Sequence, residues 1–169
     1  MSDLIVGLYE DWVWLDERIE TLTGEIEQIS HREANCKRLM SIPGIGPIIS
    51  TAMVAAIGTR SLRASRDFGA WLGLVPRQYS TGGRSILGRI SKRGSRYLRT
   101  LFIQAANVIR MRPQNWEKFS FGAWLKAAQP RLHRNKLATA LANKLARIAW
   151  SVLRHNTAFR AHRGEVVAV

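Results

Sequence analysis

Residues 73–100, GLVPRQYSTGGRSILGRISKRGSRYLRT, combine basic, glycine and hydroxyl residues without a single acidic residue. Arginine binds phosphate oxygens bidentately, and glycine lets a backbone approach a ligand closely or adopt a positive φ. The basic residues are Arg77, Arg84, Arg89, Lys92, Arg93, Arg96 and Arg99, and the glycines include Gly82 and Gly83. The composition predicts that a phosphodiester backbone lies against this segment, and the alternative is a solvated basic surface loop.

Ser80 is the candidate nucleophile of the segment, and the adjacent Thr81 is the alternative. A serine that attacks a DNA phosphate needs a group that takes its proton, cations that neutralise the phosphoryl oxygens, and in-line placement. Arg77, Arg84 and Arg89 are suited to the second task. The segment contains no His, Asp or Glu that could act as a local base, and most loop serines are turn residues.

Acidic and metal-binding residues are scarce in the basic part of the chain. After residue 33 the acids are Asp67, Glu117 and Glu165, which are too few and too scattered for a two-metal nuclease centre. The four histidines form no ligand-spaced cluster with acids, and Cys36 is the only cysteine, so a disulfide within one chain is excluded. We therefore expect no metal and no cofactor within this chain.

Charge is divided unevenly along the sequence. The net charge is +14 and the isoelectric point is near 11.3, which favours a polyanionic partner, most simply nucleic acid. Residues 1–33 hold nine acids and two bases, whereas the rest holds 24 bases and three acids. We found no signal peptide and no apolar run long enough to span a membrane, which favours a cytoplasmic, nucleoid-associated protein.

The acidic N-terminal segment has a heptad pattern. Its apolar residues recur at alternating steps of four and three: Leu8, Trp12, Leu15, Ile19, Leu22, Ile26 and Ile29. We call these seven residues the seam. The pattern predicts one helix over roughly residues 3–39, with Gly24 as its only poor helix former. The seam needs a partner, which is either a second copy of the chain or the chain's own body.

Residues 38–58, RLMSIPGIGPIISTAMVAAIG, predict two helices joined by the turn Pro43-Gly44-Ile45-Gly46. Pro47 suits the first turn of the second helix, and Gly58 suits its end. The pattern resembles the helix-hairpin-helix motif, in which backbone N–H groups near residues such as Gly44 and Gly46 bind a phosphate. A tight turn between two helices without a ligand is the alternative.

The rest of the body is predicted to be helical, which makes the fold all-α. We expect helices over about 65–72, from Ser95 as N-cap to Met111, over 114–129 and over 134–155. Trp116, Phe119 and Trp124 are expected in the core. Residues 85–90 could form a short extended piece or a hairpin. The domains are then a coiled-coil helix at 1–40, a helical body at 41–155 and a frayed tail at 156–169.

Three segments together resemble a known family. SIPGIGPIISTAMVAAIG, DFGAWLGLVPRQYSTGGRSILGRISKRGSRYLRTLF and LANKLARIAW, in this order within residues 36–155, look like the C-terminal half of the DEDD-type insertion-sequence transposases. That family includes the pilin-gene invertase and the bridge-RNA-guided recombinases. The resemblance implies an N-terminal RuvC-like domain with four magnesium-binding acids, then a coiled coil, then a helical domain whose nucleophilic serine corresponds to Ser80 or Thr81. It also implies that the serine works against the RuvC-like domain of another protomer, on DNA and guide RNA.

The sequence departs from that pattern because none of its segments resembles a RuvC-like domain, and we expect its first residues to correspond to the coiled-coil region. We therefore expect the DNA-binding C-terminal part of a transposase or site-specific recombinase, with DNA, a guide RNA and a second copy of itself as partners. Magnesium is expected only with the RuvC-like domain, and we expect no transposase activity without that domain. The alternative is a non-catalytic, architectural module that binds nucleic acid and oligomerises.

Overall fold

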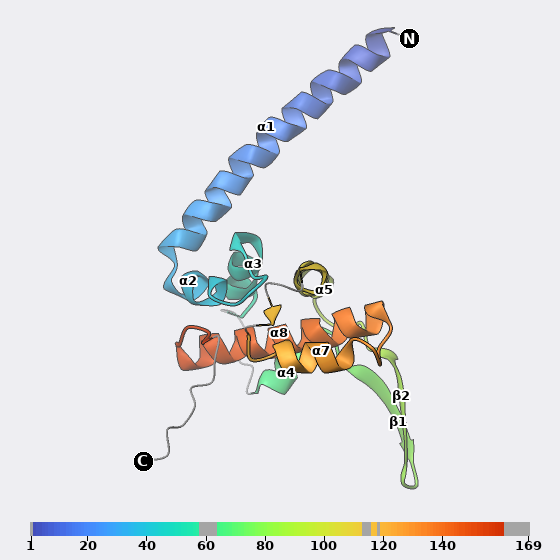
Figure 1. The fold of residues 1–169 in the computed structure, drawn as a ribbon. Coiled ribbons are helices and arrows are strands. Elements are labelled where there is room, and N and C mark those ends of the chain that lie inside the picture. Colours follow the sequence, from blue (N-terminus) through green and yellow to red (C-terminus); the bar gives the residue numbers. More distant parts are fainter. Residues whose placement is uncertain (1, 58–63, 113–115, 118, 161–169) are drawn as a thin grey trace.

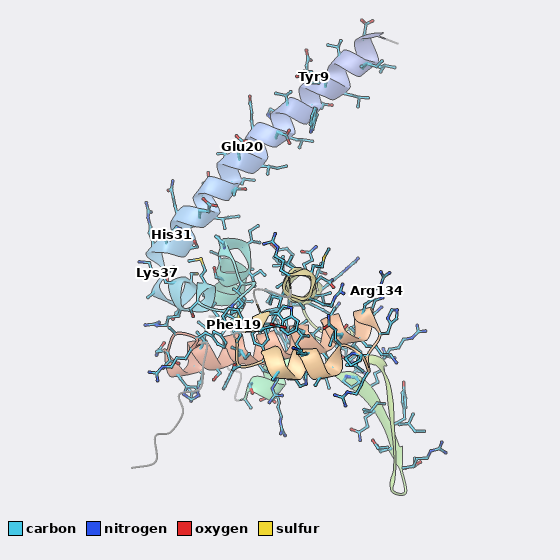
Figure 2. The ribbon with its side chains drawn as sticks, viewed as in Figure 1. Tyr9, Glu20, His31, Lys37, Phe119 and Arg134 are labelled. Carbon is cyan, nitrogen blue, oxygen red and sulfur yellow. The ribbon has the colours of Figure 1, made fainter. Side chains whose placement is uncertain are left out.

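A computed structural model describes residues 2–57, 64–112, 116–117 and 119–160. Helix α1 (Ser2–Arg32) stands clear of the body and meets it at its C-terminal end, where it contacts α2 (Ala34–Met40) and α3 (Pro47–Ile57) (Figure 1). Figure 2 shows Tyr9 and Glu20 on the protruding part, whereas Lys37 and Phe119 belong to the body. The packing of the whole seam against the chain's own body, one of the two expected partners, is therefore not observed.

The expectation of one helix over residues 3–39 is wrong at a single residue. Glu33 is extended, with φ −77° and ψ 118°, and it separates α1 from α2. The break redirects the chain so that Cys36 and Leu39 on α2 are buried in the body. Periodicity alone could not reveal the break, because the steps of four and three continue through Glu33 to Cys36.

The turn between α2 and α3 has the expected residues at its tight positions. Gly44 has φ +79°, and a Cβ added there would lie 2.8 Å from Cδ1 of Ile109 on the neighbouring helix. Pro47 is the first residue of α3, as expected, and α3 ends at Ile57. The predicted terminator, Gly58, lies outside the described residues.

In the described ranges, four further helices enclose the core: α4 (Ser65–Trp71), α5 (Arg96–Met111), α7 (Gly122–Ala128) and α8 (Arg134–His155). Helix α8 packs against α4 and α5, and its apolar residues at helical spacing are buried. The largest buried side chains on these elements include Phe68, Phe102, Leu125, Leu141 and Leu145, each worth roughly 1.5–3 kcal/mol of burial. Ser95 caps α5 as predicted, because its hydroxyl accepts a hydrogen bond from the Leu98 N–H at 3.3 Å.

The helix expected over residues 114–129 is interrupted in the structure. Among the described residues of this range, Gly122–Ala128 forms helix α7, and the chain turns at residues 119–121. A Cβ at Gly122 would lie 2.7 Å from the carbonyl oxygens of Trp116 and Glu117, so the backbone folds back on itself. Trp116 is buried, and Phe119 and Trp124 pack against the core as predicted.

The tail expected from residue 156 onward is ordered in its first part. Asn156 adopts the left-handed conformation and caps α8. Phe159 lies 6.1 Å from Phe119 and 6.5 Å from Phe121 between ring centroids, and its N–H donates to Ser41 Oγ at 2.8 Å. The frayed-tail expectation is therefore wrong for residues 156–160, and the remainder lies outside the described part of the chain.

An antiparallel hairpin interrupts the otherwise helical fold between α4 and α5. Its strands are β1 (Pro76–Thr81) and β2 (Arg84–Ile90), so the expected extended piece is a hairpin (Figure 1). In the described residues this is the only sheet, and the fold is mainly α, as predicted.

Candidate nucleic-acid site

The hairpin projects from the body as an arm, and nearly all of its side chains are exposed (Figure 1). Its tip is a two-residue turn in which Gly82 and Gly83 have φ +51° and +86°. Positive φ at both positions is what a type I′ turn requires, and glycine adopts it without steric cost. The expected glycine-rich loop is thus a strand-turn-strand unit with Ser80 two residues before the turn.

Ser80 faces Ser85 across the two strands. The side-chain amide of Gln78 donates a hydrogen bond to Ser80 Oγ at 2.7 Å and lies 3.3 Å from Ser85 Oγ. Sequence reasoning missed Gln78, although its i, i+2 spacing from Ser80 is the signal of a shared strand face. The same alternation puts Thr81 on the opposite face, so the two candidate nucleophiles are presented to different sides of the arm.

The arginines of the hairpin are exposed. Arg84 pairs with Thr81 in the register, and Arg77 shares the Thr81 face by alternation. Arg89 lies within the irregular part of β2, opposite the step from Pro76 to Gln78. The one salt bridge in the described ranges joins Lys126 and Glu117, far from these residues in sequence. Among the described residues, the cationic groups of the arm therefore have no counter-charge within the chain, and Arg77 and Arg84 lie on the face that carries Thr81.

Arg99 does not belong to this exposed group. It is only 9% exposed, and its Nη1 donates to the carbonyl oxygens of Leu72 at 2.9 Å and Arg93 at 3.3 Å. Its expected role as a DNA contact is inconsistent with that burial. Arg99 instead ties α5 to the two chain segments that enter and leave the hairpin.

Those two segments cross at close range. A Cβ at Gly73 would clash with the Arg93 carbonyl oxygen, and a Cβ at Gly94 would clash with the Trp71 carbonyl oxygen. Lys92 is a non-glycine residue with φ +56°, a conformation that costs energy and persists only where the surroundings enforce it. The base of the arm is thus fixed by backbone packing.

The other expected phosphate contacts divide into two places. Lys92, Arg93 and Arg96 are exposed at the base of the arm. Gly44 and Gly46 lie on the α2–α3 turn, and in Figure 1 that turn and the hairpin are at opposite ends of the body. The structure therefore does not bring the two predicted regions together, and one nucleic acid would have to span the body to contact both.

A second cationic group lies on α8, and sequence reasoning gave it no role. Lys144 and Arg147 line a pocket of about 300 Å³ with Ser65, Ile148 and Ser151. Burial lowers the pKa of Lys144 from its usual value, and the nearby charge of Arg147 lowers it further. The sequence feature that could have revealed this cationic group is the absence of any acidic residue from α8.

The acid set that magnesium needs is not found in the described residues. No group of three or more His, Cys, Asp or Glu side chains lies close enough there to hold a metal ion. The residues present do not fit the magnesium centre that the family resemblance implies for a RuvC-like domain. Within the same part of the chain, no helix has the length and apolar character needed to cross a bilayer.

Known proteins match the segment that holds these features. Residues 36–120, from α2 through the hairpin and α5, match the family described as Transposase IS116/IS110/IS902. The chain is 43% identical over 162 residues to a probable family 20 transposase of Pseudomonas aeruginosa, covering 95% of the chain and 47% of the relative. It is 42% identical over 157 residues to the transposase of insertion sequence element IS1328 of Yersinia enterocolitica, covering 92% of the chain and 47% of the relative.

The transposase of IS1111A from Coxiella burnetii is 37% identical over 162 residues, covering 95% of the chain and 44% of the relative. The chain therefore spans somewhat less than half the length of these curated relatives. The matched family segment contains the α2–α3 turn, the complete hairpin with Ser80, and the Arg99 anchor. The chain belongs to the IS116/IS110/IS902 family of transposases.

Proposed function

We propose that this chain binds DNA through the hairpin arm and presents Ser80 as the nucleophile for DNA strand exchange. The observation that carries the proposal is the arm itself, which is exposed, free of acids and rigid at its base. A serine near the tip of such an arm can reach a phosphate in a duplex that the body does not enclose. The cations of the arm would reduce the repulsion between an attacking oxygen and the anionic phosphate.

In the proposed step, Ser80 Oγ forms a bond to phosphorus and the bond from phosphorus to one DNA oxygen breaks. The Ser80 proton leaves to a base, and the departing DNA oxygen takes up a proton. Arg77, Arg84 and Arg89 would neutralise the phosphoryl oxygens. The arm offers no base, so proton transfer requires groups outside it, which by family resemblance belong to a RuvC-like domain.

The α2–α3 turn is proposed as a second, sequence-independent DNA contact. Gly44 and Gly46 precede the start of α3 at Pro47, where a helix-hairpin-helix motif offers backbone N–H groups to a phosphate. Its distance from the arm would place the two contacts on separate stretches of nucleic acid. DNA and a guide RNA both offer the phosphodiester backbone that this geometry accommodates, and the compartment proposed is the bacterial cytoplasm, at the nucleoid.

A second copy of the chain is proposed as the partner of α1. Leu8, Trp12 and Ile19 of the seam are 69%, 60% and 59% exposed, respectively. An isolated helix gains little stability in water without an apolar neighbour, so a seam of this length favours pairing with another helix.

The test of the proposed chemistry is a covalent protein–DNA adduct. The chain is mixed with a full-length family enzyme or its RuvC-like half, magnesium, guide RNA and target DNA, and adducts are resolved under denaturing conditions. We expect an adduct with the unchanged chain and with Thr81→Ala, and none with Ser80→Ala. An adduct that survives Ser80→Ala would refute the Ser80 assignment, and DNA binding without any adduct would support the architectural alternative.

A further inference from the structure

We propose that two copies of the chain pair through α1 in antiparallel orientation, with Arg18 of one copy beside Glu25 of the other. This inference rests on the self-association proposed above and adds its orientation and register. It comes from the charged positions that flank the seam, which the apolar pattern alone does not use.

The seam assigns every residue of α1 to a heptad position. Leu8, Leu15, Leu22 and Ile29 take the d positions, and Trp12, Ile19 and Ile26 take the a positions. The flanking e and g positions carry the interhelical charge pairs that set the orientation of a coiled coil. The g positions are Asp11, Arg18, Glu25 and Arg32, and the e positions are Tyr9, Asp16, Thr23 and Ser30.

The g positions alternate in sign along the helix, whereas the e positions hold one charge, Asp16. In a parallel pair, each g residue faces the e residue five positions later in the partner. Asp11 would then face the partner's Asp16, which is a repulsion, and Arg18 and Glu25 would face uncharged residues. A parallel pair would thus contain no attractive flanking pair.

In an antiparallel pair, g residues face g residues. When Ile19 packs against the partner's Leu22, Arg18 lies beside the partner's Glu25 and Asp11 beside the partner's Arg32. Symmetry repeats both contacts, which gives four pairs of opposite charge. Asp11, Arg18, Glu25 and Arg32 take part in no salt bridge within the described chain, so they are available for these contacts.

The same pattern selects the register. A slip of one heptad toward the N-termini would place Arg18 beside the partner's Arg18 and Asp11 beside the partner's Glu25. A slip of one heptad the other way would place Glu25 beside the partner's Glu25 and Arg18 beside the partner's Arg32. Both neighbouring registers therefore replace attractive pairs with like-charge contacts. A like-charge contact destabilises the helix pair by about as much free energy as an attractive contact contributes.

The far end of α1 also favours this arrangement. Leu4, Ile5 and Leu8 near the N-terminus are all strongly exposed. In the proposed register they extend past the partner's Arg32, toward the body of the partner. Helix α3 lies there, without a charged residue and with Ile48 exposed. A parallel pair would instead leave these N-terminal residues at the end of α1 that is remote from both bodies.

Distance measurements between spin labels test the orientation. A label at Asp3→Cys in a Cys36→Ser background should lie about 50 Å from its copy if the helices are antiparallel, because some 35 residues at 1.5 Å rise separate them. A parallel pair would bring the same labels to about 20 Å or less. Glu20→Cys, close to the proposed two-fold axis, is the control and should give a short distance in either orientation.

Charge exchange tests the register. Arg18→Glu should weaken dimerisation in sedimentation equilibrium by roughly ten- to thirtyfold, because it turns two attractive pairs into two repulsive ones. Arg18→Glu with Glu25→Arg restores the pairs at unchanged composition and should restore the dissociation constant. A monomeric wild-type chain would refute the self-association itself. A dimer with short Asp3→Cys distances, or one that Arg18→Glu leaves unchanged, would refute only the antiparallel register.

Discussion

The side-chain amide of Gln78 donates to Ser80 Oγ at 2.7 Å, and both residues lie on the strand face that also carries Ser85. A donated hydrogen bond occupies a lone pair of the hydroxyl and leaves its proton free to be removed. It also fixes the direction of the remaining lone pair on an otherwise exposed side chain. Gln78 therefore has the geometry of a residue that positions the proposed nucleophile without touching the phosphate.

The first prediction follows from that geometry. Gln78→Ala should reduce adduct formation by about tenfold while leaving DNA affinity unchanged, because misdirection of a nucleophile affects reaction rather than binding. The measurement is the adduct rate in the mixture with the RuvC-like half, alongside fluorescence anisotropy on the same DNA. Thr81→Ala, on the opposite face, serves as the control. An equal loss of affinity and adduct in Gln78→Ala would show that Gln78 acts in binding.

Arg99 yields a prediction about stability. Arg99→Ala should lower the free energy of unfolding by about 1–3 kcal/mol, since the carbonyl oxygens of Leu72 and Arg93 lose the donor that satisfies them. Urea titration followed by circular dichroism measures the change. Arg96→Ala, three residues earlier and exposed, should alter stability by less than about 0.5 kcal/mol. If both variants unfold at the same urea concentration, Arg99 is not the anchor of the arm.

The glycines of the arm provide a matched pair, because they share a positive φ but differ in the space around them. Gly94→Ala should be strongly destabilising, since its Cβ would run into the Trp71 carbonyl oxygen. Gly82→Ala meets nothing within 4 Å and bears only the strain of its φ of +51°, of order 1 kcal/mol. In thermal unfolding, the melting temperature of Gly94→Ala should be well below that of Gly82→Ala. The reverse order would contradict the close backbone packing at the base of the arm.

Much of this fold was predictable because local patterns dominate it. Three local patterns each predict the helix in which they occur: the seam, the Ser95 cap and the 3.6-residue periodicity of α8. The break at Glu33 and the turn at residues 119–121 were missed for one common reason. Both are imposed by packing, through burial of Cys36 and Leu39 in one case and the close backbone contacts of Gly122 in the other.

In the candidate site, too, the sequence predicted local features and missed those that packing imposes. The residue types alone identified an acid-free, glycine-rich segment with Ser80 as its candidate nucleophile, and the family resemblance supported a nucleophile at Ser80 or Thr81. Composition could not distinguish the buried Arg99 from the exposed Arg96, because both occur in the same basic run and their difference depends on which face of α5 meets the Leu72 carbonyl. The extended conformation of β1, which puts Gln78 on the same face as Ser80, was likewise not determined by the residue types.

The last prediction concerns how the arm binds nucleic acid. The affinity for duplex DNA should fall linearly in a log–log plot against salt, with a slope of roughly −0.9 for each phosphate neutralised. Arg84→Ala at the tip removes one exposed cation and should reduce the magnitude of the slope by about 1 with little dependence on DNA sequence. Arg131→Ala, which removes the same charge outside the arm, is the control and should leave the slope nearly unchanged. An equal reduction in both variants would mean that binding reflects the overall charge of +14 rather than the arm.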